Sequence, residues 1–219
     1  WKAGGTAVSN TDGSITSQVS ANVNAGFSIV KYTGNGSTTA TIGTGLNEKV
    51  ELVLIKNIDQ STVWSAVQLL EQAVGNLNNN NAMTFSYYLG NTTSSVLGFT
   101  AQNNAWNQSS NNHIAYCFHS VAGYSKVGSY VGTGASGHVV YTGFEPSWIM
   151  YKATNSASKS WVIRDNKRGS DTLLYPDLTN ADTVKNPNNL SFLTNGFEML
   201  DGDSYMNGSG INYIFMAIA

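Results

Sequence analysis

The chain has 219 residues, enough for one large or two small domains with a hydrophobic core. Only 11% of the residues are charged and the formal net charge is −2, so no basic stripe can follow a phosphate backbone and we expect no nucleic-acid partner. The longest apolar runs are too short to cross a bilayer, and we expect no membrane span.

Asn, Ser, Thr and Gly stand where charged residues would otherwise be, and there are 22 glycines. Amide and hydroxyl side chains bond to nearby backbone and favour turns over helices. Glycine supplies the positive φ angles that tight hairpins need. The composition therefore predicts an all-β protein.

Strand patterns begin near the N-terminus. The dipeptides Gly4-Gly5 and Asp12-Gly13 predict an arm or hairpin over residues 1–24. Apolar residues alternate from Phe27 to Tyr32, and Val50 to Ile55 is a β-branched run typical of a central strand. Gln68 to Gly75 carries apolar residues at helical spacing and is the one segment expected to be helical.

Further strands and loops are predicted along the rest of the chain. Asn78 to Asn81 is expected to form an exposed loop, and Ser147 to Tyr151 is a second central strand. Asn111 to Phe118 and Asn212 to Ile218 are apolar strands that follow polar turns. Short strands separated by Gly and Asn turns are typical of β-sandwiches.

An internal repeat organises these segments. Ala25-Gly26-Phe27-Ser28 recurs as Ala122-Gly123-Tyr124-Ser125, and further matches follow in the same order. These are Tyr32 with Tyr130, Trp64 with Trp161, Gly98-Phe99 with Gly196-Phe197, and Ile114 with Ile214. We therefore expect two tandem, duplicated, jelly-roll-like sandwich units, at residues 25–121 and 122–219, after the arm.

Several segments also carry a family resemblance. They are Trp1 to Ile15, Ala25 to Gly36, His113 to Phe118, Tyr141 to Phe144, and Leu173 to Pro176. Together they resemble an uncharacterised β-rich domain of marine, cyanophage-type bacteriophage proteins that are associated with the virion and often described as tail-fibre-like. The resemblance implies a virion location, a chain that continues upstream of Trp1, and no catalytic residue to carry over.

Residues with metal-binding chemistry favour structural roles. Cys117, the only cysteine, lies in an apolar run, which favours a buried small side chain. Cys117 and His119 share one strand face, but His113 has Tyr213 as its counterpart, which favours packing over ligation. Asp201-Gly202-Asp203 resembles a loose calcium loop, and a solvated turn is the favoured interpretation. No metal or other cofactor is expected.

Aromatic residues suggest two roles. Trp64 and Trp161 occupy matching places in the repeats, which favours the core. Trp106 lies among loop residues and has no tryptophan counterpart. Trp106, Asn104 and Asn107 are therefore the candidate ligand-binding set.

The expected function is that of a non-enzymatic virion structural protein, tail-fibre-like or decorating. It would form a homo-oligomer, a trimer by analogy with phage fibres, and contact other virion proteins. The alternative is a carbohydrate-binding adhesin that recognises host glycans. The sequence shows no pair of carboxylates recognisable as the acid and base of glycoside hydrolysis, and it contains no Gly-x-Ser-x-Gly motif. We therefore do not expect a hydrolase.

Overall fold

The computed structural model describes residues 2–86, 89–100, 104–185 and 187–219. Within them the regular elements are β-strands, apart from one 3-10 turn, η1 (Val23–Ala25). The predicted all-β, sandwich-like fold is confirmed. No helix in the described part of the chain has the length and apolar composition of a membrane span.

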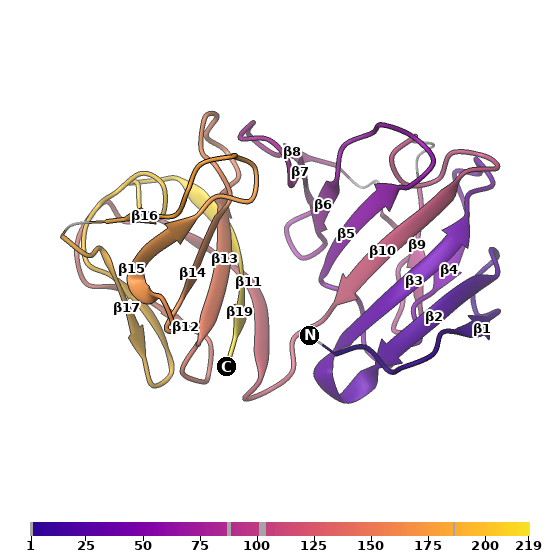
Figure 1. Cartoon of the computed structure of the whole chain (residues 1–219), viewed down its shortest axis with the longest axis horizontal. Coiled ribbons are helices and arrows are strands. Elements are labelled where there is room, and N and C mark those ends of the chain that lie inside the picture. The colour runs from indigo at the N-terminus through magenta and orange to yellow at the C-terminus, as the bar shows by residue number, and fades with distance from the viewer. Residues whose placement is uncertain (1, 87–88, 101–103, 186) are drawn as a thin grey trace. The chain divides into compact units, whose positions relative to one another are not determined.

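The chain divides into two compact units (Figure 1). Unit 1 comprises Trp1–Asn76 and Phe85–Ser120. Unit 2 comprises Val121–Ala219 together with Leu77–Thr84. The short segment Leu77–Thr84, hereafter the strap, belongs to the first repeat in sequence and to unit 2 by its contacts.

The larger sheet of unit 1 has the strand order β1-β2-β3-β10-β5-β6-β7-β8 (Figure 1). Its strands are β1 (Val8–Asn10), β2 (Ser17–Asn22), β3 (Phe27–Thr33), β10 (Asn112–Phe118), β5 (Leu52–Asn57), β6 (Ser65–Gln68), β7 (Ala73–Asn76) and β8 (Thr84–Phe85). A smaller sheet pairs β4 (Thr41–Gly43) with β9 (Val96–Gly98). Within residues 1–24, β1 and β2 form a hairpin that extends the large sheet beyond β3.

Unit 2 has a six-stranded sheet in the order β11-β19-β13-β14-β15-β16. Its strands are β11 (Ser125–Val131), β19 (Asn212–Ile218), β13 (Trp148–Ala153), β14 (Val162–Asp165), β15 (Gly169–Leu174) and β16 (Thr183–Val184). The smaller sheet has the order β12-β18-β17, formed by β12 (His138–Tyr141), β18 (Gly196–Met199) and β17 (Leu190–Leu193).

Each core lies between the large and the small sheet of its unit. In unit 1, Ile42 of β4 and Leu97 of β9 belong to one buried cluster with Val53 of β5 and Ala115 of β10. In unit 2, Phe197 of β18 clusters with Tyr151 and Phe215 of the large sheet. Apolar residues at alternate strand positions produce these inward faces.

The two large sheets share the strand order that a duplication predicts. β3-β10-β5-β6-β7-β8 in unit 1 corresponds to β11-β19-β13-β14-β15-β16 in unit 2. Strand registers also agree, because Tyr32 faces His113 as Tyr130 faces Tyr213. The common origin of the repeats stays a hypothesis that this agreement supports.

One of the sequence matches is wrong by two residues. The amide of Thr44 donates to the carbonyl of Ser95, and the amide of Thr142 donates to the carbonyl of Asn195. Ser95 therefore corresponds to Asn195, which pairs Gly98 with Glu198 instead of Gly196. A Gly-Phe dipeptide is too short to fix a register by itself.

The predicted helix over Gln68–Gly75 is also wrong. This segment is the turn between β6 and β7, where Gln68 pairs with Ala73. The Gln68 side chain accepts a hydrogen bond from the Glu71 amide at 2.7 Å, and Gln72 adopts a φ of 54°. Side-chain bonds to backbone close the turn and displace the helical alternative.

Candidate functional site

Trp106, one of the candidate ligand-binding residues, lies in the core of unit 1. Only 2% of its surface is exposed, and it belongs to the same cluster as Ile42 and Leu97. Its carbonyl accepts the hydroxyl of Tyr32 at 2.5 Å. The polar residues around Trp106 in the sequence suggested a surface loop, but the loop turns this ring inward.

Asn107 is fully buried and holds a neighbouring loop. Its Oδ1 accepts the amide of Asn35 at 3.0 Å, and its Nδ2 donates to the carbonyl of Ser37 at 2.8 Å. Asn207 of unit 2 does the same for Thr133 and Ala135, at 2.9 and 2.7 Å. A buried amide whose donor and acceptor are both used is a structural clamp.

Glycine is required where these clamps meet the loops. A Cβ on Gly34 would lie 2.3 Å from the carbonyl oxygen of Gln108, and one on Gly132 would lie 2.3 Å from that of Gly208. Backbone oxygens cannot move aside as a flexible side chain can. The close approach explains the Gly in both Tyr-x-Gly sequences.

Of the candidate ligand-binding set, only Asn104 is exposed. Its carbonyl accepts the Asn57 side chain at 2.8 Å. Burial of Trp106 and Asn107 removes their side chains from the surface, so these three residues do not form a common contact surface.

The histidines pack and bond within their units. His113 is fully buried and stacks on Tyr32 with ring centroids 5.1 Å apart, as Tyr213 stacks on Tyr130 at 4.9 Å. Burial lowers the pKa of His113. His138 Nδ1 lies 2.9 Å from Asn207 Oδ1. The described residues contain no group of three or more His, Cys, Asp or Glu side chains placed to hold a metal.

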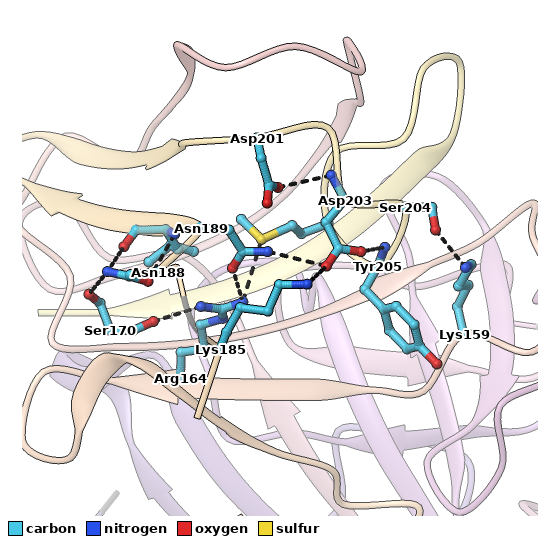
Figure 2. Close-up of polar contacts among 12 residues, drawn as sticks. Lys159, Arg164, Ser170, Lys185, Asn188, Asn189, Asp201, Asp203, Ser204 and Tyr205 are labelled. Atoms are coloured by element: carbon cyan, nitrogen blue, oxygen red, sulfur yellow. Dashed lines mark hydrogen bonds and ion pairs between the residues drawn. The ribbon is translucent and has the colours of Figure 1, made fainter. Parts of the chain in front are cut away.

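A polar cluster in unit 2 is centred on Arg164 of β14 (Figure 2). Arg164 is only 1% exposed. Its guanidinium donates to the carbonyl of Ser170 at 2.7 Å, to Asn189 Oδ1 at 2.6 Å and to the hydroxyl of Tyr151 at 3.2 Å. A buried cation held by neutral acceptors joins β13, β14, β15 and the loop before β17.

Asn189 links this cation to a carboxylate. Its Nδ2 donates to Asp203 Oδ2 at 3.2 Å, while Lys185 Nζ donates to the same oxygen at 2.7 Å (Figure 2). Burial raises the pKa of Asp203, but the hydrogen bond from Lys185 and that from the Tyr205 amide outweigh it and lower the pKa overall. A chain of hydrogen bonds therefore runs from Arg164 through Asn189 and Asp203 to Lys185.

The same contacts argue against calcium in the Asp201–Asp203 loop. Both oxygens of Asp203 already accept N–H donors, from Tyr205 on Oδ1 and from Lys185 and Asn189 on Oδ2. Asp201 Oδ1 accepts the Asp203 amide at 2.9 Å. A cation would have to displace these donors, and the loop is a hydrogen-bonded turn.

Two tyrosines border the cluster. The rings of Tyr175 and Tyr205 meet edge to face, with centroids 6.5 Å apart. Lys159 Nζ lies 4.6 Å from the Tyr205 ring centroid and donates to Ser204 Oγ at 2.7 Å. Partly buried aromatic rings thus stand beside a lysine, a hydroxyl and the Lys185–Asp203 ion pair.

Sequence reasoning missed this cluster. Arg164 was not among the candidate residues. The signal was the alternation in Val162-Ile163-Arg164, which places Arg164 on the same inward face as the buried Val162. A basic residue at an inward position of a strand indicates a buried polar network.

Comparison with known proteins gives a family without an assigned role. No curated protein and no solved structure matches the chain. One family model, described as a domain of unknown function (DUF7483), matches residues 1–219. The match spans the whole chain, and the chain therefore belongs to the DUF7483 family.

Proposed function

We propose that the chain is a non-enzymatic structural protein of a bacteriophage virion, tail-fibre-like or decorating, that works through assembly and surface contact. The supporting observation is where the buried polar groups are used. Arg164 bonds to Asn189 in the loop before β17, Asn189 bonds to Asp203, and Asn207 bonds to Ala135, so each is used within its own unit. Such bonds make loops rigid, whereas a catalytic group needs access to a substrate.

Surface composition supports assembly. Unit 2 exposes large apolar side chains, among them Tyr141 at 68%, Val184 at 63% and Val131 at 56%. With few charges to keep copies apart, such side chains favour association. A homo-oligomer, a trimer by analogy with phage fibres, is the expected state, in contact with other virion proteins at the particle surface.

Light scattering coupled to size-exclusion chromatography tests this proposal. We expect a mass of three chains, stable to dilution, with more than about 1,000 Å² buried in each interface. Tyr141→Ser should weaken association, whereas Asn104→Ser should not. A sharply melting monomer at high concentration contradicts the assembly role.

A carbohydrate-binding adhesin is the second candidate, and the Tyr175–Tyr205 border of the cluster favours it. Aromatic rings beside hydrogen-bonding groups suit sugars, which offer both C–H faces and hydroxyls. Tyr205→Ala should abolish binding on a glycan array, and Tyr141→Ala should not. An array on which the unaltered protein binds no glycan contradicts this candidate.

A further inference from the structure

A pocket of about 440 Å³ opens on unit 1. It is lined by Glu48, Lys49, Val50, Glu51, Leu69, Leu70, His119 and Ser120. Ligand sites in proteins commonly span about 300–1,000 Å³. The pocket therefore has room for a side chain or a small molecule.

Backbone contacts hold its walls in place. The Glu51 amide donates to the carbonyl of Phe118 at 2.8 Å, and the Leu69 amide donates to the carbonyl of Glu51 at 2.7 Å. These bonds tie the residue before β5 to the end of β10 and to the β6–β7 turn. A site whose walls are already fixed loses little entropy on binding.

The Glu51 carboxylate is oriented by Ser120. Its Oε2 accepts the Ser120 amide at 2.7 Å and the Ser120 hydroxyl at 2.5 Å. Both donors meet the same oxygen, and Oε1 receives no hydrogen bond from the described residues. An oriented carboxylate with an oxygen to spare is an acceptor for a cationic donor.

The remaining walls are apolar or add charge. Val50 and Leu69 are buried, and Leu70 is 55% exposed at the rim. Glu48 and Lys49 are exposed and oppose each other in charge. Apart from His119, the lining carries a net charge of −1 from two carboxylates and one ammonium. Aliphatic walls next to a carboxylate match the methylene stem and charged head of a basic side chain.

We propose that this pocket binds an alkylammonium or alkylguanidinium group, with the charged head on Glu51 and the stem along Leu69 and Leu70. The group comes from a lysine or arginine of a second copy of the chain or from a free ligand. The proposal stands apart from the virion role, because it rests only on the chemistry of the pocket.

Amide chemical shifts of the full chain test it. Titration with n-butylguanidinium should shift the amides of Ser120, Leu69 and Leu70, whereas n-butanol and n-butyrate should not. Glu51→Gln should weaken binding by at least roughly tenfold, because the charge is lost while the Ser120 acceptor is kept. Glu145→Gln removes an equal charge from an exposed position in unit 2 and should leave binding unchanged.

Three results overturn the proposal: no shift with the cation, an equal shift with n-butanol, or unchanged binding by Glu51→Gln. Once binding is seen, the mass of the protein with and without n-butylguanidinium identifies the source. A fall in mass shows that a second copy supplies the group. An unchanged mass assigns the pocket to a free ligand.

Discussion

Several residues have the same structural role at equivalent positions of the two units. Asn107 and Asn207 clamp equivalent loops, and the hydroxyls of Tyr32 and Tyr130 both donate to the carbonyl of the residue before the clamp. Gly34 and Gly132 admit the same close backbone approach. The residues that recur in both units therefore fix the conformation of equivalent loops. Residues that differ between the units, such as Arg164, form contacts that only one unit has.

Removing a clamp should destabilise its unit. Asn207→Ala removes a fully buried side chain and its bonds to the Thr133 amide and the Ala135 carbonyl, each worth about 0.5–1.5 kcal/mol net. We expect a clear fall in the free energy of unfolding, measured in urea. Asn104→Ala, an exposed control, should change it by less than about 0.5 kcal/mol. Equal effects would mean that Asn207 is not a clamp.

The two matching tryptophans should differ in cost. Trp161 is 1% exposed, and Trp161→Ala should lower the free energy of unfolding by roughly 3–5 kcal/mol through lost burial and a cavity. Trp64 is only partly buried and stacks on Tyr116 with centroids 6.0 Å apart, so the core role predicted for it holds only in part. Trp64→Ala should cost less, and thermal unfolding of both variants decides the matter.

At the scale of elements, the strap is the least expected feature. Two backbone hydrogen bonds join it to the rest of unit 2. The Met83 amide donates to the Thr154 carbonyl at 2.8 Å, and the Lys159 amide donates to the Asn80 carbonyl at 3.2 Å. Lys152 Nζ donates to the Asn81 carbonyl at 2.9 Å. Lys152 is 1% exposed, and burial lowers its pKa to about 8 while Asp177 opposes the shift.

This lysine predicts a pH dependence. Between pH 8 and 10.5 the unfolded chain holds a proton on Lys152 that the folded chain has released, so raising the pH favours the folded state. The free energy of unfolding of the unaltered protein, minus that of Lys152→Met, should therefore rise across this window. Other titrating groups cancel in the difference. A difference that stays flat or falls would show that Lys152 remains charged.

Elements were predicted well where a strand has two apolar neighbours. The run from Val50 to Ile55 overlaps β5, and Asn111 to Phe118 overlaps β10, because central strands are apolar for most of their length. Gln68 to Gly75 failed because Leu69, Leu70 and Val74 fit a helix and a hairpin turn equally well. The burial of Trp106 and of Arg164 was not predicted, because tertiary contacts and not neighbours in sequence decide which side chains turn inward.

At the scale of the whole molecule, unit 2 includes the strap, a segment that lies between two parts of unit 1 in the sequence. Replacing Leu77–Thr84 by Gly and Ser residues of equal number removes the buried Met83 side chain and displaces the Asn81 carbonyl, one of the two carbonyls to which Lys152 Nζ donates. We expect a lower melting temperature for unit 2 and faster proteolysis within it, while the indole N–H resonance of Trp106 in unit 1 changes little. Unchanged melting of unit 2 would show that the strap contributes nothing.

Mechanical load is where the strap matters most. The chain passes between the units three times, after Asn76, after Thr84 and after Ser120. A force that separates the units is therefore shared between the direct connection at Ser120 and a parallel one that must first peel the strap from Thr154, Lys152 and Lys159. Tension on the strap would load its hydrogen bonds to Thr154, Lys152 and Lys159 in addition to the covalent chain at Ser120.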